Sequence, residues 1–290
     1  MTDASAKPLA VPAFLSQLSV EITPRQAEKI PLLREKLAPG TRIFVALIDP
    51  ADIEKQVEAV AALRGAGFEP VPHVPARFVR NRDDLARRLE AFVSQAKVGQ
   101  ALVLGGGAPQ PLGEYDAAIQ LLETGLFEAN GITRIGMAGH PEGNPDIAKA
   151  RGEAMLMTAL KAKQAYLAEK GLKGFIATQF LFEAAPVAYW AKSLRDEGIN
   201  LPIHVGVPGP ATIKTLVKYA AMCGVGNSAR FIRKQALNVT KLLTVSNPDA
   251  FVEGLAKLHI ERPELNIAGP HLYPFGGFDK LLDWLTPRLR

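Results

Sequence analysis

Short apolar runs alternate with longer segments of helical pattern along most of the chain, and this alternation limits the fold more than any other feature. Eight such runs occur, at 18–22, 42–48, 68–74, 101–106, 134–139, 175–180, 202–207 and 266–273. Most are rich in Val, Ile, Leu and Phe without polar–apolar alternation, which is typical of strands that are buried on both faces. Strands that alternate with helices in this way favour a parallel sheet.

The segments between the runs carry helix signals at 24–38, 50–67, 81–96, 147–171, 184–198 and 210–224. Asp83 and Asp84 lie in the first turn of one of them, where the helix dipole favours negative charge. Gly171 closes the longest one. Pro31 lies inside the first and is expected to break or kink it.

Eight strand–helix units in 290 residues fit a closed (β/α)8 barrel, the TIM barrel, whose typical length is about 250 residues. The rival is a doubly wound open sheet, which usually has a glycine-rich first turn. No glycine occurs in the ITPRQ sequence that follows the first run. We therefore predict an α/β protein with one catalytic barrel domain over residues 1–290, residues 1–17 being an N-terminal extension. We place two or three extra helices in the wide interval 202–273, between strands seven and eight.

Charge and composition narrow the class of partner. The net charge is +5, but Lys and Arg are scattered, and the densest cluster, RFIRK at 230–234, has the spacing of a helix face. A nucleic-acid partner is therefore not expected. The surplus of positive charge fits an anionic small-molecule ligand better. Cys223 is the only cysteine, which excludes an intramolecular disulfide framework. Without a membrane-length apolar stretch or a secretion signal, we expect a cytoplasmic protein with no membrane partner.

In a (β/α)8 barrel the active site lies at the carboxyl ends of the strands. The polar residues and glycines at or near those ends are Glu21, Asp49, His73, Gly105, Gly106, Gly107, His140, Asn144, Gln179, His204, His271 and Tyr273. Of the five histidines, only His259 lies in a helical stretch that we expect to be solvated.

Several of these residues have a structural interpretation beside the functional one. Asp49 precedes Pro50 and is best interpreted as a helix cap. His73 is either a hydrogen-bonded core histidine or a ligand contact. The three glycines form either a tight turn or a place where backbone approaches a ligand closely. Gln179 is harder to explain structurally, because a buried amide needs hydrogen-bond partners.

Common motifs of metal-dependent enzymes, serine hydrolases and P-loop proteins are absent from the sequence. It contains no HExxH or His-x-x-x-His metal pattern, no GxSxG nucleophile elbow and no Walker A loop. Glycoside hydrolysis would need two carboxylates at strand ends, and only Glu21 and Asp49 qualify. Asp49 is better explained as a helix cap. The remaining acid, amide, histidines and glycine turns indicate a site in which a cofactor does the difficult chemistry.

The order of several motifs resembles the methylenetetrahydrofolate reductase family over about residues 18–278. These motifs are LSVEITP, PHV, LVLGGGAPQP, GMAGHPEGNPD, LKAKQAYLAEKG followed by LKGFIATQFLF, and LPIHVGVPGPATIKTLVKYAAMCGV. The G-x-PEG-x-P turn and the ATQFLF strand are the most specific. The chain resembles a short, divergent, single-domain form of that family.

The resemblance implies a barrel that binds FAD non-covalently at the carboxyl ends of the strands. NADH or NADPH would reduce the flavin, and 5,10-methylenetetrahydrofolate and 5-methyltetrahydrofolate would be interconverted, as in the one-carbon metabolism that supplies methionine biosynthesis. Tetrahydrofolate derivatives are therefore the expected partners, and a homo-oligomer is left open.

The resemblance also assigns residues. Glu21 matches the family's catalytic glutamate, a general acid that protonates N10 of the folate so that the five-membered ring opens. Gln179 and Tyr273 match substrate-binding positions. Positions that correspond to FAD contacts are His73, Leu104, Gly105, Gly106, Gly107, Ala138, His140, Asn144 and Lys163. No metal ligand is implied.

Two departures from the family pattern stand out. Strand four of the family typically ends in Arg-Gly-Asp, where this chain has three glycines, and PFGG follows Tyr273 in place of a Thr-Leu-Asn-Arg-like sequence. These changes keep two alternatives open, a flavin barrel for a different pterin or one-carbon carrier and a non-catalytic barrel that binds folate or a partner subunit. A Schiff-base aldolase ranks low because no run ends in a lysine.

Overall fold

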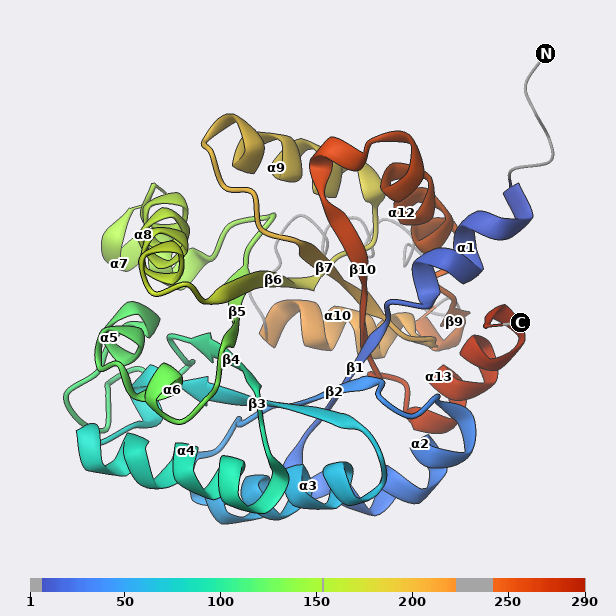
Figure 1. The fold of residues 1–290 in the computed structure, drawn as a ribbon. Helices are drawn as coiled ribbons and strands as arrows, with labels where there is room; N and C mark the ends of the chain where they lie inside the picture. Colours follow the sequence, from blue (N-terminus) through green and yellow to red (C-terminus); the bar gives the residue numbers. More distant parts are fainter. Residues whose placement is uncertain (1–6, 153, 223–241, 290) are drawn as a thin grey trace. The chain divides into compact units, whose positions relative to one another are not determined.

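The computed structural model describes residues 7–152, 154–222 and 242–289. Eight strands form a closed barrel in the order β1–β10–β7–β6–β5–β4–β3–β2, with helices between them (Figure 1). The pairs β2–β3, β3–β4, β4–β5 and β7–β10 are parallel. The predicted (β/α)8 architecture is confirmed.

Each predicted apolar run contains or overlaps one barrel strand. The strands are β1 (Ser19–Ile22), β2 (Arg42–Val45), β3 (Glu69–Pro75), β4 (Gln100–Leu104), β5 (Arg134–Gly139), β6 (Lys173–Phe180), β7 (Ile203–Pro208) and β10 (Ile267–Tyr273). Their burial is nearly continuous, as in β7, where every residue is buried. Strands covered on both faces need apolar side chains on both, which explains the absence of alternation in the sequence.

The helices mostly follow the predicted segments. They are α1 (Lys7–Leu15), α2 (Ile30–Lys36), α3 (Ile53–Gly65), α4 (Arg82–Ala96), α5 (Ala118–Glu123), α6 (Leu126–Ala129), α7 (Pro145–Arg151), α8 (Met155–Glu169), α9 (Ala184–Asp196), α10 (Ile213–Met222), α12 (Asp249–Glu261) and α13 (Phe278–Leu285). Short 3-10 turns cover Pro24–Lys29, Pro50–Asp52, Ala76–Phe78, Pro263–Leu265 and Thr286–Arg288. No helix in this described part of the chain is long and apolar enough to cross a membrane.

Two helix predictions need correction. The segment 147–171 is not one helix, because Gly152 has a φ of +83° between α7 and α8, a left-handed conformation that ends the first helix. The segment 24–38 breaks before Pro31 and not at it. Pro31 lies in the first turn of α2, where its missing N–H is not needed for a helical hydrogen bond.

The interval between β7 and β10 contains more than one helix, as predicted. In its described residues, α10 and α12 are accompanied by the antiparallel pair β8 (Ala211–Thr212) and β9 (Val245–Ser246). Cys223 and the basic cluster 230–234 lie outside the described residues.

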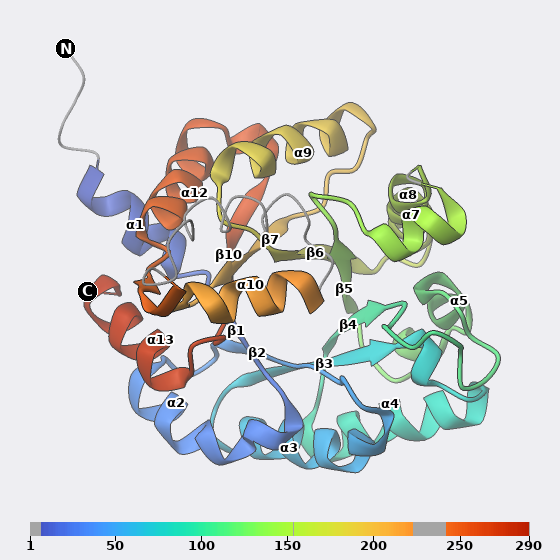
Figure 2. The same ribbon diagram turned by 180° about the vertical axis from the view of Figure 1, so that it is seen from behind.

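The chain divides into two compact units, and the prediction of a single domain remains a prediction. Unit 1 comprises Met1–Ser19, Gly139–Thr158 and Ala177–Arg290, and unit 2 comprises Val20–Ala138 and Ala159–Ile176. In unit 1, α1 packs on α12, beside which it lies in both views (Figure 2). The predicted extension 1–17 therefore includes a packed helix.

His259 lies in a helix, as predicted, but its side chain is half-buried and not fully solvated. His259 lies on α12, and its Nδ1 is 2.6 Å from the carbonyl oxygen of Ile267. Its ring centroid is 5.7 Å from that of Phe14, a buried residue of α1. The imidazole therefore joins α12 to β10 and α1 within unit 1.

The interior of unit 2 is packed so closely that it leaves no space for a side chain at one strand position. Phe44 of β2 and Phe175 of β6 meet edge to face, with ring centroids 6.1 Å apart. A Cβ on Gly136 of β5 would lie 2.5 Å from Cζ of Phe175 and 2.9 Å from Cδ1 of Leu102. Gly136 is therefore required by close packing.

Gly136→Ala should lower the free energy of unfolding by about 1–3 kcal/mol, because the added methyl overpacks the interior. Urea denaturation measures the change. Gly99→Ala is the matched control, since a Cβ there would meet nothing within 4 Å. It should stay within about 0.5 kcal/mol of the parent. Equal stability of the two variants would contradict this account of Gly136.

Candidate functional site

The residues that the family resemblance assigned and that lie on barrel strands all occupy the carboxyl-terminal half of their strand, where (β/α)8 barrels carry their sites. This holds for Glu21, His73, Leu104, Ala138, Gln179 and Tyr273. Unit 2 contributes the first four of them and unit 1 the last two.

Glu21 and His73 are brought together within unit 2. Oε2 of Glu21 on β1 lies 3.5 Å from Nε2 of His73 on β3, and the side chains are 20% and 10% exposed. This separation exceeds that of a normal hydrogen bond, but catalytic pairs are often long in the absence of substrate. A carboxyl and an imidazole so placed, largely shielded from water, can exchange a proton after a small movement.

Gln56, which the sequence did not single out, fixes the backbone of His73. Its side chain is 1% exposed. Its Nε2 donates to the carbonyl oxygens of Val45 at 2.8 Å and His73 at 3.0 Å. The amide therefore joins the ends of β2 and β3. A glutamine on the buried face of a helix was the available signal, because such an amide must find partners.

Asp49 is the helix cap that the sequence indicated. Its Oδ1 accepts from the backbone N–H of Ala51 at 3.0 Å, at the start of the turn Pro50–Asp52. Arg25 also approaches the Asp49 carboxylate, at 3.4 Å. The structural interpretation of Asp49 is confirmed.

The glycine stretch after β4 leaves its backbone accessible. A Cβ on Gly105 or Gly107 would meet nothing within 4 Å. Gly106 has a φ of +92°, and a Cβ there would lie 2.9 Å from Cβ of Pro75. The middle glycine is therefore required by conformation and close approach, while its neighbours leave space that a ligand can use.

Arg77 organises the segment that follows these glycines, and the sequence analysis missed it. Its backbone N–H donates to the carbonyl oxygen of Gly105 at 2.9 Å, and its NH1 donates to that of Ala108 at 2.9 Å. Its guanidinium pairs with Asp116, with NH2 and Oδ1 2.8 Å apart. An arginine from another segment, paired with Asp116, thus contacts the stretch in which the resemblance would lead us to expect Arg-Gly-Asp.

Lys163 is a buried cation on α8 of unit 2. Its side chain is 8% exposed, and burial lowers the pKa of its ammonium to about 8. No carboxylate in the described part of the chain offsets this lowering of the pKa. A buried charge without a counter-charge is unfavourable, and a phosphate oxygen would relieve it. Together with the open glycine stretch, Lys163 makes unit 2 fit a phosphate-bearing cofactor such as the flavin dinucleotide that the resemblance implies.

His140 and Asn144 form the turn that leads into α7 in unit 1. Gly143 donates its N–H to the carbonyl oxygen of His140 at 3.0 Å. The side-chain oxygen of Asn144 accepts from the N–H of Ile147 at 3.1 Å, which is a capping interaction. The predicted contact of these two residues with FAD remains a prediction.

Gln179 and Tyr273 are linked through Thr178. The Tyr273 hydroxyl donates to the Thr178 carbonyl at 3.0 Å. The Tyr273 ring stacks on Phe275 with centroids 5.3 Å apart, and Phe275 stacks on Tyr219 at 4.1 Å. Phe275 belongs to the PFGG sequence that departs from the family, so this departure introduces an aromatic stack at the end of β10.

His204 and His271 are core residues of unit 1. They are 2% and 0% exposed, and Nδ1 of His271 lies 2.8 Å from Oγ of Ser19. Within the ranges that the structure describes, no three or more His, Cys, Asp or Glu side chains are grouped as ligands for a metal ion.

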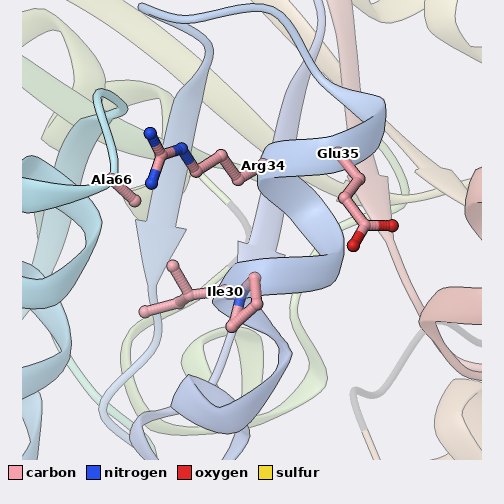
Figure 3. Close-up of a pocket in the computed structure, with 5 residues that line it drawn as sticks. Ile30, Arg34, Glu35 and Ala66 are labelled. Carbon is pink, nitrogen blue, oxygen red and sulfur yellow. The ribbon is translucent and has the colours of Figure 1, made fainter.

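Neither of two surface cavities by itself defines a folate site. An open recess of about 430 Å³ is lined by Ile30, Pro31, Arg34, Glu35 and Ala66 (Figure 3). Ala66 follows α3 and precedes β3, so this recess lies on the side of the amino ends of the strands. A cavity of about 130 Å³ beyond the carboxyl end of β7 is lined mostly by apolar residues, including Phe182, Pro208 and Phe251. It is smaller than the roughly 300 Å³ at which ligand pockets begin.

The chain is similar to a distant relative whose function is stated. No family model matches the chain. A protein described as a probable methylenetetrahydrofolate reductase (NADPH) from Caenorhabditis elegans is 26% identical over 204 residues. These residues are 65% of this chain and 29% of that protein, so the chain matches less than a third of the relative's length. The similarity supports a divergent relationship to the methylenetetrahydrofolate reductases.

Lys163→Met should stabilise the ligand-free protein at pH 7 by on the order of 3 kcal/mol. The pKa of Lys163 is about 8 in the folded chain, below its ordinary value of 10.5, so the unfolded chain binds the proton more tightly. The cost of the buried charge is full below about pH 8 and disappears as the pH rises towards 10.5. Urea unfolding at pH 7 and about pH 10 should show the advantage of the variant shrinking.

Lys161→Met on the same helix is the control, because Lys161 is exposed. It should leave the free energy of unfolding nearly unchanged at both pH values. A Lys163→Met variant that is no more stable than Lys161→Met at pH 7 would show that Lys163 is not an uncompensated buried charge.

Proposed function

We propose that the chain is a flavin-dependent oxidoreductase that interconverts 5,10-methylenetetrahydrofolate and 5-methyltetrahydrofolate, with NADH or NADPH as co-substrate. The 3.5 Å contact between Glu21 and His73 is the observation that carries the proposal, because it provides a shielded proton donor at the carboxyl ends of β1 and β3. The barrel fold and the similarity to a probable methylenetetrahydrofolate reductase (NADPH) support it. We assign the activity to cytoplasmic one-carbon metabolism that supplies methionine biosynthesis.

Unit 2 offers groups that would hold FAD non-covalently. The Lys163 ammonium would bind a phosphate of the dinucleotide, and Leu104 with Gly105, Gly106 and Gly107 would present backbone to it. His73 and Ala138 of the same unit would contribute further contacts that the family resemblance assigns. The resemblance also assigns contacts to His140 and Asn144, which belong to unit 1. When bound, the flavin would carry reducing equivalents between the nicotinamide and the folate.

Glu21 would act as the general acid in the direction of reduction. Its carboxyl proton passes to N10 of 5,10-methylenetetrahydrofolate, and the bond between N10 and the methylene carbon breaks. The lone pair of N5 forms a double bond to that carbon, which can then accept a hydride. His73, with Nε2 beside the carboxylate, is placed to return the proton to Glu21.

Gln179 and Tyr273 would bind and orient the folate. An amide side chain can donate and accept hydrogen bonds side by side, which suits the nitrogen-rich edge of a pterin. Gln179 lies one residue from the carboxyl end of β6 and is half-buried. The Tyr273 ring offers an aromatic surface at the end of β10.

A second candidate follows from the altered strand ends. The open glycines after β4 and the added Phe275 change the surroundings in which the family anchors folate. A barrel of this kind could bind a different pterin, or bind folate or a partner subunit without turnover. Turnover of 5-methyltetrahydrofolate by the flavin-loaded protein separates the proposed function from these alternatives.

Glu21→Gln should abolish folate-dependent turnover while FAD affinity changes little. The amide keeps the shape of the side chain but has no carboxyl proton to give. The measurement is NAD(P)H oxidation with 5,10-methylenetetrahydrofolate, next to a spectroscopic titration with FAD. Glu28→Gln, on an exposed glutamate of the turn Pro24–Lys29, should behave as the parent. Turnover that survives in Glu21→Gln would overturn the assignment of the acid.

Lys163→Met should weaken FAD binding about tenfold or more, because it removes the charged partner of a phosphate. Binding by the parent should also weaken above about pH 8, where free Lys163 loses its proton. Titrations with FAD from about pH 7 to pH 9.5 measure both effects. Lys161→Met should match the parent in affinity and pH dependence. Equal affinities of the Lys163→Met and Lys161→Met variants for FAD would show that Lys163 does not bind the FAD phosphates.

A further inference from the structure

Both carbonyl groups that flank the Cα of Gln179 are held by side-chain hydroxyls. The Thr178 carbonyl accepts from the Tyr273 hydroxyl at 3.0 Å, and the Gln179 carbonyl accepts from Oγ1 of Thr178 at 2.6 Å. In a regular parallel ladder such carbonyls accept from backbone N–H groups of the neighbouring strand. The end of β6 is therefore shaped by two side chains.

The Thr178 hydroxyl also reaches the neighbouring strand. Its oxygen accepts from the N–H of Gly206 on β7 at 2.8 Å, so one hydroxyl both donates and accepts. A Cβ on Gly206 would lie 2.5 Å from the Gln179 carbonyl oxygen, which means that β7 approaches β6 closely at this point. Thr178 is 1% exposed, so water does not compete for these bonds. All of these groups belong to unit 1.

We infer that Thr178 and Tyr273 are positioning residues that fix the direction of the Gln179 side chain. The two peptide planes that meet at a Cα determine where its Cβ points, and here each plane is held by one hydroxyl. The inference rests on the proposed function, in which Gln179 binds the folate ring. It adds that the specificity of this contact depends on Thr178, which touches no ligand itself.

Removal of the Thr178 hydroxyl should allow the backbone around Gln179 to change its conformation. Thr178→Val has nearly the same volume but leaves the N–H of Gly206 and the Gln179 carbonyl without their partner in a buried place. The backbone must then shift to find other partners, and the Gln179 amide moves with it. Thr178→Ser keeps the hydroxyl and is the conservative rescue.

The test is a double-mutant cycle on the affinity for 5-methyltetrahydrofolate, measured by anaerobic calorimetry on the protein with its flavin already reduced, so that the folate binds without being oxidised. Gln179→Ala and Thr178→Val should each weaken binding about tenfold, and Thr178→Ser should stay within about threefold of the parent. The Thr178→Val/Gln179→Ala variant should bind no more weakly than Gln179→Ala alone. Such non-additivity is the readout that a merely structural role would not produce.

Tyr273→Phe provides a second route that does not depend on the folding of Thr178→Val. It keeps the ring, removes the hydroxyl on the Thr178 carbonyl, and should show the same non-additivity with Gln179→Ala. A Thr178→Val variant that melts at a lower temperature but binds folate normally would overturn the inference. So would losses that multiply in the double variants.

The outcomes also separate this inference from the proposed function. If Gln179→Ala weakens folate binding and Thr178→Val does not, the inference fails and the proposed function stands. If the parent binds no folate, or if Gln179→Ala binds it normally, the assigned role of Gln179 is wrong. The inference, which rests on that role, is then wrong as well.

Discussion

Parallel pairing is the constraint on which the rest of the structure depends. It directs the carboxyl end of every barrel strand to the same end of the barrel, so each strand can contribute a functional side chain at its last residues. The contact of Glu21 on β1 with His73 on β3 is one result, and the attachment of Tyr273 on β10 to Thr178 on β6 is another. The interior below these ends is packed tightly enough to require Gly136. A close-packed interior transmits little movement, which suits a scaffold for residues that must keep their positions.

The strands could be predicted from the sequence because burial on both faces leaves an uninterrupted apolar run, and β5 coincides with its predicted run at 134–139. The cap formed by Asp49 was also predictable, because the interaction is local. The break at Gly152 was not, since an isolated glycine is tolerated in many helices and its φ depends on the surrounding fold. The partial burial of the His259 side chain was not predictable for a similar reason, because its partners Phe14 and Ile267 are set by tertiary packing.

In the candidate site, the sequence pointed to Glu21 and His73 separately, and the structure brings them together. The sequence analysis did not identify Gln56, Arg77 or Thr178 as organising residues. These three act on backbone groups of other segments, as Gln56 does on His73 and Thr178 on Gly206. Such contacts follow from strand register and loop path, which no local pattern encodes. A polar side chain on an apolar face shows that partners exist but does not show which ones.

In the proposed function, Lys163 illustrates how binding a phosphate can oppose the stability of the ligand-free chain. A buried ammonium whose pKa is lowered to about 8 reduces the free energy of unfolding of the ligand-free protein. An anionic group bound beside it would offset that loss. Binding sites commonly retain such costs because selection acts on function above a stability threshold. In the same proposal, the ligand would occupy the open space beside Gly105 and Gly107 after β4.

The absorption spectrum of the freshly purified protein, recorded before and after anaerobic addition of 5-methyltetrahydrofolate, tests the central claim most directly. The account predicts a yellow protein with the two-band spectrum of a flavin, whose visible band fades when the folate is added. A colourless protein that takes up no added FAD would contradict it. So would a bound flavin that keeps its visible band in the presence of the folate.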